Sequence, residues 1–298
     1  MSLFDHLVSE ALHGLAELAP LQAVVEKELL HHDILREMSA EGLLSGLTFM
    51  GGTCLRSCYG SNRLSEDLDF TGGADFSREQ LITLGRTLEE RIAVKYGLRV
   101  EVSEPTRESG NVATWKLRVT TRPEQRNLPA QRINIDICAI PSHDPRPMML
   151  RNPYGVDMGT SGLVIQAESR EEILADKLVA LALRPNRIKN RDLWDIVWLR
   201  QQGVVLPLSL LPRKIQDHRC ASVYFVELVD SRRRELEDNP ALHSDFLNEM
   251  SRFLPARLVS DTVANADFWR YLVAEVSSEC RNITGFLKGA GNEKMFVM

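Results

Sequence analysis

The sequence predicts an α/β (α+β) protein, with a strand-containing domain over residues 1–168 and a helical C-terminal domain over residues 169–298. Before residue 168, short apolar or alternating segments bounded by glycine and proline are typical of strands, and amphipathic helical segments lie between them. After residue 168 the apolar residues recur only at helical spacing. Because no low-complexity linker separates the two patterns, we expect two adjoining domains rather than domains on a flexible tether.

The N-terminal elements follow in order. Residues 1–47 are predicted to be helical, because their apolar residues recur at helical spacing. A second amphipathic helix is expected over Ser77–Tyr96, with Ser77 and Gln80 as a capping box, and a long connection over residues 141–162. Strands are expected at Leu47–Met50, Leu64–Phe70, Leu98–Val102, Ala113–Thr121, Gln131–Ile140 and Leu163–Ala167, with a short helix at Thr53–Cys58.

The C-terminal elements are all expected to be helices. The first two are predicted at Arg170–Leu183 and Arg191–Gln202, and further helices extend to about Leu287.

Composition and charge limit the class of protein. The chain has 298 residues, of which 44% are hydrophobic and 26% charged, as in a globular protein, and no apolar run approaches the roughly 20 residues that cross a bilayer. A net charge of −5 excludes a generally basic nucleic-acid binder. The N-terminus has no signal-peptide pattern, and the five scattered cysteines fit reduced thiols rather than a zinc site. We therefore expect a cytoplasmic protein without a membrane partner.

The most informative stretch is residues 51–70, which read GGTCLRSCYGSNRLSEDLDF. In a strand, Asp67 and Asp69 point to the same face, with Leu68 and Phe70 turned to the core. Two parallel carboxylates repel each other unless a cation neutralises them, and hard oxygen ligands suit Mg²⁺, which usually brings phosphates with it. The pattern predicts phosphate chemistry on a nucleotide; the alternative is a plain strand end.

A third acid tests the metal hypothesis. Residues 131–140 read QRINIDICAI, so Asp136 lies opposite the isoleucine face, in the middle of a strand where an acid is disfavoured. If this strand neighbours the one that carries Asp67 and Asp69, three carboxylates converge, and such a cluster holds two Mg²⁺ ions about 3.5–4 Å apart. The alternative is an acid on a solvated sheet face.

The glycines before the acids have a chemical use as well. Gly51 and Gly52 let the backbone approach a phosphate closely, and Thr53 offers a hydroxyl to a phosphate oxygen at the start of a helix. The alternative is a simple glycine turn.

Two later helices add candidates. Lys177 lies on an apolar stripe, where an ammonium is costly unless it reaches water or an anion such as a triphosphate. In the next helix, Asp192 lies near the helix start, where the helix dipole alone favours an acid, and Arg191 pairs either with phosphate or with a neighbouring acid.

Basic residues cluster in the C-terminal half. They form either a surface for a polyanion or ordinary solvated helix faces. The clusters are Arg184, Arg187, Lys189 and Arg191; Arg213, Lys214, His218 and Arg219; and Arg232, Arg233 and Arg234.

At this point the sequence resembles a known family. GGTCLRSCYG followed by RLSEDLDF is similar to the glycine–hydroxyl and DxD signature of the DNA polymerase β-like nucleotidyltransferase superfamily. The later segments INIDI, ILADKLVAL and NRDLWDIVWL resemble the abortive-infection nucleotidyltransferase toxins of the AbiEii/AbiGii type, the toxin halves of bacterial toxin–antitoxin pairs. The match covers about residues 45–200, and Thr53 stands where the family usually has Ser.

The resemblance implies a fold, an activity and roles. The fold would be a mixed twisted sheet flanked by helices, and the activity Mg²⁺-dependent transfer (with Mn²⁺ as an alternative) of a nucleotide from an NTP to RNA, with the tRNA acceptor end as the expected target. That transfer would block translation, and an antitoxin would be the partner. The implied metal ligands are Asp67, Asp69 and Asp136; the nucleotide contacts are Gly52, Thr53, Arg63, Ser65, Lys177 and Arg191; Asp136 would assist deprotonation of the attacking hydroxyl, and Asp192 is the functional candidate of the later motif.

Three rival functions remain. The acceptor would be a protein hydroxyl in an AMP-transferring relative. A non-catalytic regulatory protein would bind the NTP without turnover. A helical interaction protein would use the basic clusters as its partner surface and bind no NTP.

Overall fold

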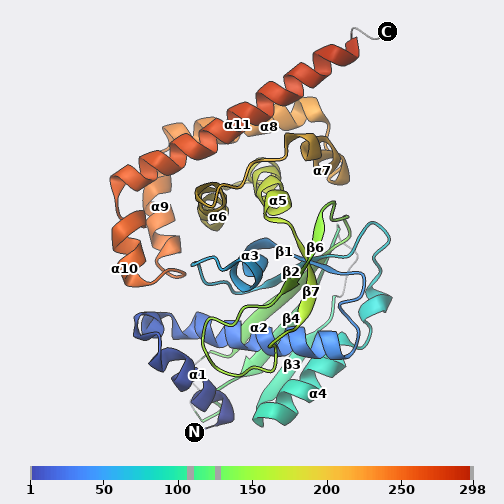
Figure 1. Ribbon diagram of the computed structural model, residues 1–298, viewed down its shortest axis with the longest axis vertical. Coiled ribbons are helices and arrows are strands. Elements are labelled where there is room, and N and C mark those ends of the chain that lie inside the picture. The colour runs from blue at the N-terminus through green and yellow to red at the C-terminus, as the bar shows by residue number, and fades with distance from the viewer. Residues whose placement is uncertain (1, 106–110, 125–128, 296–298) are drawn as a thin grey trace. The chain divides into compact units, whose positions relative to one another are not determined.

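The computed structural model describes residues 2–105, 111–124 and 129–295, with side chains to residue 289. The chain divides into two compact units, Met1–Glu168 and Ser169–Met298 (Figure 1). The first contains the sheet and the second is helical, which confirms the predicted α/β class.

In the first unit, the described residues form one seven-stranded sheet in the order β3-β4-β5-β2-β1-β7-β6. The pairs β2–β5 and β1–β7 are parallel and the other pairs are antiparallel, so the sheet is mixed. The strands are β1 (Thr48–Met50), β2 (Leu68–Thr71), β3 (Arg99–Ser103), β4 (Val112–Thr120), β5 (Gln131–Cys138), β6 (Pro145–Met149) and β7 (Val164–Glu168).

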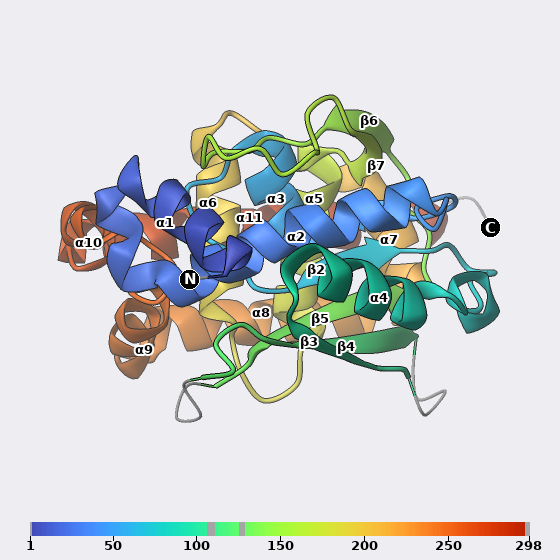
Figure 2. The ribbon, with the colours of Figure 1, turned by 90° about the horizontal axis from the view of Figure 1, so that it is seen from below.

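Helices cover the apolar face of this sheet. Helix α2 packs against β5 and α4, and α4 packs against β3, so the two helices lie side by side (Figure 2). Beneath them, alternate residues of β4 and β5 such as Trp115, Leu117 and Ile135 are buried, as the strand period requires. The helices of this unit are α1 (Leu3–His13), α2 (Gln22–Ala40), α3 (Gly51–Tyr59) and α4 (Leu84–Tyr96), with the 3₁₀ helices η1 (Ala16–Leu21) and η2 (Arg78–Leu81).

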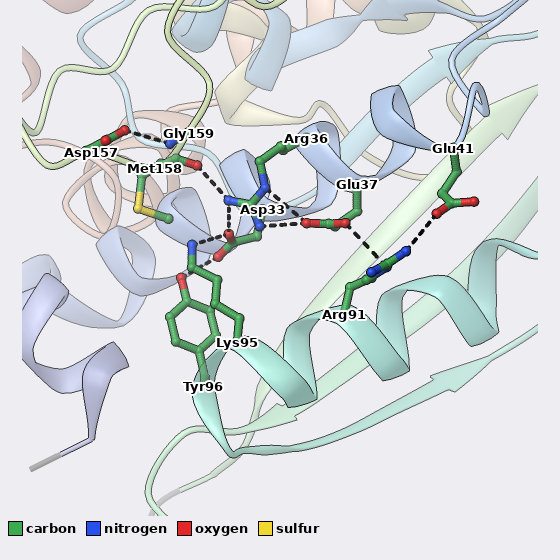
Figure 3. A network of polar contacts seen from close by, with 10 residues as sticks. All are labelled: Asp33, Arg36, Glu37, Glu41, Arg91, Lys95, Tyr96, Asp157, Met158 and Gly159. Atoms are coloured by element: carbon green, nitrogen blue, oxygen red, sulfur yellow. Dashed lines mark hydrogen bonds and ion pairs between the residues drawn. The ribbon is translucent and has the colours of Figure 1, made fainter.

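A buried carboxylate fixes α2 to α4. Asp33 has no exposed surface and accepts hydrogen bonds from Lys95 Nζ at 2.6 Å and Tyr96 Oη at 2.5 Å, both at the end of α4. Its other neighbour, Arg36, lies 2.8 Å away and also donates to the carbonyl of Met158 at 2.7 Å (Figure 3). The network therefore joins two helices and the loop before β7.

Strand β2 is shorter than predicted. It begins at Leu68, whereas the expected strand began at Leu64. The physical reason is that backbone groups just before β2 bond to side chains instead of to a neighbouring strand: the Ser65 amide donates to Glu28, and the Asp67 carbonyl accepts from Thr53. Asp67 therefore lies immediately before the strand, not within it.

Two other expectations were wrong. Residues 141–162 contain a strand, β6, whose prolines obscured it; β6 is an edge strand, the place in a sheet where a missing N–H is tolerated. The single helix expected over Ser77–Tyr96 is divided into η2 and α4, and Ser77 makes no side-chain cap hydrogen bond.

The second unit is built from helices around α6. Helix α6 packs against α5, α9 and α11, and the α5 helix starts at an N-cap, Ser169, whose hydroxyl accepts from the Glu172 amide at 3.1 Å. The α-helices are α5 (Arg170–Leu183), α6 (Asn190–Gln201), α7 (Leu211–Asp217), α8 (Ser222–Asp238), α9 (Ala241–Met250), α10 (Ala256–Leu258) and α11 (Ala266–Met295), with the 3₁₀ helix η3 (Leu208–Leu210) and the π-helix η4 (Val259–Val263). Among the described residues, no helix is long and apolar enough to cross a lipid bilayer.

Candidate active site

Two of the predicted acids lie side by side in the sheet. Asp69 of β2 and Asp136 of β5 are direct partners in the parallel register. Partners in register project to the same face, and the flanking Leu68, Phe70 and Ile135 are buried on the opposite face. Asp69 and Asp136 are therefore both on the side of the sheet that faces away from the apolar core, and both are half-buried.

Asp67 joins this pair from the loop before β2. Its Oδ1 accepts a hydrogen bond from the Asn134 amide of β5 at 2.9 Å. This bond holds the Asp67 carboxylate against the strand that carries Asp136. The fold thus brings all three predicted metal ligands to β2, β5 and the loop directly before β2.

The two glycines lie where side chains do not fit. Gly51 has φ +75°, a left-handed conformation that favours glycine, and a Cβ there would lie 2.8 Å from Asp69 Oδ2. A Cβ on Gly52 would collide with the guanidinium of Arg63 and lie 3.5 Å from Ser65 Oγ. At the start of helix α3, the backbone of Gly51 therefore lies close to the Asp69 carboxylate, and that of Gly52 lies close to the Arg63 guanidinium.

The predicted hydroxyls and arginine are buried around the loop before β2. Thr53 is fully buried; its Oγ1 hydrogen-bonds to Ser65 Oγ at 2.7 Å and donates to the Asp67 carbonyl. Arg63 is only 3% exposed, and its Nη1 donates to the Leu64 carbonyl at 3.0 Å. These side chains shape the loop that presents Asp67.

Helix α2 supplies a carboxylate, Glu28, that bonds to the loop before β2 and that the sequence did not single out. Glu28 accepts from the Ser65 amide at 2.8 Å and from Arg56 Nε at 3.0 Å, and it also accepts from the Tyr154 hydroxyl. Burial and the charge of Glu28 raise the pKa of Tyr154 well above its ordinary value, so this hydroxyl keeps its proton and donates. An acid on the apolar stripe of α2, with Val24 and Val25 beside it, was the signal that could have found it.

Two more residues of α2, Lys27 and His31, bind Glu66, the loop residue directly before Asp67. Lys27 Nζ lies 2.7 Å from Glu66 Oε1, and His31 Nε2 lies 3.0 Å from the Glu66 carbonyl. Burial lowers the pKa of His31 to about 4, so the ring is neutral near pH 7. Helix α2 thus fixes both residues that precede Asp67.

In the second unit, Lys177 already has two anionic partners. Its ammonium lies 2.7 Å from Asp192 Oδ1 and 2.9 Å from Asp195 Oδ2, and Arg184 Nη1 contacts Asp192 Oδ2 at 2.6 Å. Burial alone would raise the pKa of Asp192, but the charges of Lys177, Lys189 and Arg184 hold it well below its ordinary value. Lys177 and Asp192, both predicted from sequence, belong to one cluster whose two carboxylates are buried, and the second of these, Asp195, is a member that the sequence did not reveal.

Arg191 takes the alternative that the sequence left open. Its Nε lies 3.3 Å from Glu249 Oε1, and its guanidinium lies over the Phe253 ring, 4.7 Å from the centroid. Arg191 therefore connects α6 to Glu249 of α9 and to Phe253, which follows α9 in the chain.

Acids accompany many of the C-terminal basic residues. Arg232 and Arg233 pair with Glu235 and Glu237 at 2.5 and 2.6 Å. The sequence grouped Lys214 with the surface charges, which was wrong: it is fully buried, with its ammonium 2.5 Å from Glu172 and 2.9 Å from Asp176. The sequence did not indicate this burial, because a single lysine in a helix is usually a surface residue and its acidic partners lie on another helix, α5.

The cysteines form no disulfide among the described residues. All five, each within the described residues, are free thiols. This agrees with the reduced thiols that the sequence predicted.

The chain matches a known protein family over most of its length. Residues 33–273 match the family described as "Nucleotidyl transferase AbiEii toxin, Type IV TA system". No curated protein matches the chain in sequence. Among solved structures, the nucleotidyltransferase toxin MenT4 from Mycobacterium tuberculosis is 16% identical, with 96% of this chain and 89% of that chain covered and a TM-score of 0.53. JHP933 from Helicobacter pylori is 18% identical, with 91% and 98% covered and a TM-score of 0.43.

The family match includes the loop before β2, strand β5 and both helices of the Lys177 cluster. The likeness to MenT4, at low identity, supports the fold. Since the match extends over most of the sequence, this chain belongs to the AbiEii nucleotidyltransferase toxin family of type IV toxin–antitoxin systems, and it is a nucleotidyltransferase.

Proposed function

We propose that this toxin transfers a nucleoside monophosphate from an NTP to RNA, with the acceptor end of tRNA as the target, in a Mg²⁺-dependent reaction that blocks translation. The observation that supports this most is the pairing of Asp69 with Asp136 in register, with Asp67 held against the same strand. Family membership implies an NTP substrate, usually a divalent metal, and an antitoxin partner.

The donor set fits a hard divalent cation. Carboxylate oxygens from Asp67, Asp69 and Asp136 are the ligands that Mg²⁺ prefers, and Mn²⁺ accepts the same set. Gly51 leaves open the space beside the Asp69 carboxylate that a Cβ would fill. Bound there, the metal would neutralise charge on the triphosphate.

The chain's own residues would orient the substrates and take up a proton. The acceptor hydroxyl oxygen forms a bond to the α-phosphorus, the bond to the pyrophosphate breaks, and Asp136 assists removal of the hydroxyl proton. The amides at the start of α3, at Gly52 and Thr53, favour an anion. Ser65 and Arg63, buried beside them, would hold the nucleotide phosphates.

Residues of the second unit are proposed to serve the same reaction. Lys177 would bind the triphosphate, and Asp192 would hold the Lys177 ammonium in place, as the 2.7 Å ion pair between them suggests. Arg191 would contribute a nucleotide contact only by leaving Glu249.

A labelled-transfer assay tests the proposal. Each of the four NTPs, labelled in the α-phosphate, is incubated with the toxin, Mg²⁺ and either total tRNA or RNA-free lysate protein. The proposal predicts label on tRNA and its loss with EDTA. Label on protein alone would instead favour transfer to a protein hydroxyl, and NTP binding without any labelled product would favour a non-catalytic regulator.

A further inference from the structure

A row of cations lies on the same sheet face as the acids. In the antiparallel register of β4 and β5, Thr114 pairs with Asp136, Lys116 with Asn134, and Arg118 with Arg132. Partners in register share a face, and the buried Trp115 and Leu117 occupy the other one. The row formed by Lys116, Arg118 and Arg132 is therefore continuous with Asp136, at the edge of the sheet formed by β3, β4 and β5 (Figure 2).

The row is exposed and carries net positive charge. Lys116, Arg118 and Arg132 are all exposed. Arg118 contacts Glu101 of β3 at 3.0 Å, and Glu101 also pairs with Arg99. Within the ranges that the structure describes, Lys116 and Arg132 form no ion pair. A sheet face that exposes cations next to a candidate metal site suits a polyanion.

The spacing along the strands favours a polymer. At about 3.3 Å per residue, Lys116 lies roughly 7 Å along the sheet from the level of Asp136, and the pair Arg118 and Arg132 roughly 13 Å. An extended chain with its reacting end at Asp136 would place successive phosphates along this row. The C-terminal basic clusters suit this less well, because Arg232, Arg233 and Lys214 are engaged by acids.

We propose that Lys116, Arg118 and Arg132 bind the phosphate backbone of the RNA acceptor next to its reacting end. This inference rests on the proposed function, since it needs an RNA acceptor at the acids. Sequence reasoning missed the row because these three residues lie on two strands and only the strand register brings them together.

Two variants with opposite expected effects test the proposal. Lys116→Ala/Arg132→Ala removes two phosphate contacts, so its dissociation constant for labelled total tRNA should rise. The slope of log K against log salt should fall in magnitude by about 1.4–1.8. Glu101→Gln releases Arg118 from its acidic partner and should tighten tRNA binding, a gain that misfolding does not produce.

Steady-state transfer then separates RNA from nucleotide. For Lys116→Ala/Arg132→Ala, we expect a raised KM for tRNA with kcat and the KM for NTP unchanged. The control Arg86→Ala/Arg257→Ala removes two exposed cations outside the row, with the same change of net charge, and should behave as wild type.

Three results would overturn the assignment. The first is unchanged tRNA affinity and salt slope in the row variant. The second is a raised KM for NTP alone, which would make the row a nucleotide site. The third is a loss of tRNA binding in Arg213→Ala/Arg234→Ala but not in the row variant. That result would mean that the C-terminal basic clusters bind the RNA acceptor. In each case the wild-type enzyme still labels tRNA, whereas a wild type that never labels RNA would contradict the proposed function itself.

Discussion

Glu28 connects three segments to the loop of Asp67 through a single carboxylate. Its partners are the Ser65 amide, Arg56 of α3 and Tyr154. Because Glu28 touches no metal ligand directly, it acts as a positioning residue: it orients the backbone from which Asp67 and Asp69 follow.

Glu28→Gln keeps the shape and removes the charge. We expect kcat to fall about ten-fold or more, and a higher Mg²⁺ concentration to be needed for half-maximal transfer, because the loop would hold its acids less firmly. The measurement is the transfer rate as a function of Mg²⁺ concentration. The control is Glu41→Gln, which changes an exposed acid directly after the C-terminal end of α2. Equal Mg²⁺ dependence in wild type and Glu28→Gln would show that the carboxylate does not position the acids.

Gly51 offers a matched pair of substitutions. Gly51 and Gly73 both have positive φ, but only at Gly51 would a Cβ meet Asp69; nothing lies within 4 Å of one on Gly73. Alanine at either position should lower the free energy of unfolding by about 1 kcal/mol or more, because the backbone conformation is unfavourable for alanine. Only Gly51→Ala should abolish transfer. Chemical denaturation and the transfer assay measure the two effects. Full activity in Gly51→Ala would show that the close approach of the Gly51 backbone to Asp69 is not needed for transfer.

Two buried histidines of helix α2 make the stability of the fold depend on pH. Burial lowers the pKa of His31 to about 4, and burial with the charge of Lys95 does the same for His32. The ordinary pKa of histidine is about 6.5. Between pH 6.5 and 4, the two imidazoles are therefore protonated in the unfolded chain but neutral in the folded chain. The stability they contribute is present above pH 6.5 and is lost as the pH falls.

The expected slope follows from this count. Each imidazole should lower the free energy of unfolding by about 1.4 kcal/mol per pH unit in the middle of that range. Urea unfolding at several pH values measures it. His32→Asn should reduce the slope by about half of the two-imidazole contribution, while His13→Asn, an exposed residue, should leave it unchanged. An unaltered slope in His32→Asn would mean that this ring titrates normally in the fold.

The sequence predicted best those elements whose own side chains decide their structure. The isoleucine alternation fixed β5 and the face of Asp136, and α5 has the predicted bounds Arg170–Leu183. The start of β2 was not predictable, because side chains from α2 and α3 take its backbone groups. Strand β6 was hidden because prolines only signal an edge strand once the sheet order is known.

The sequence identifies the candidate acids of the site but not the residues that surround them. Asp67 and Asp69 were found as two acids one residue apart in an apolar frame, and Asp136 because an acid is disfavoured in the middle of a strand. Glu28, Asp195 and the row on β4 and β5 are ordinary polar residues in the sequence, and long-range contacts alone reveal them. Lys177 shows the limit most clearly: its apolar stripe indicated an anionic partner, but the buried Asp192 and Asp195 as its partners follow only from the packing of α5 against α6.

The transfer rate of Asp69→Asn tests most directly whether the acids on β2 and β5 carry the nucleotidyl transfer. This variant keeps the shape of the side chain beside Asp136 and removes its charge, and circular dichroism verifies its fold. We predict that transfer of labelled nucleotide to tRNA falls by at least a factor of about 100, as for loss of a group that stabilises transition-state charge, while Asp75→Asn, an exposed acid nearby in sequence, retains the wild-type rate. A folded Asp69→Asn enzyme that transfers nucleotide at the wild-type rate would contradict the assignment of Asp69 as a metal ligand.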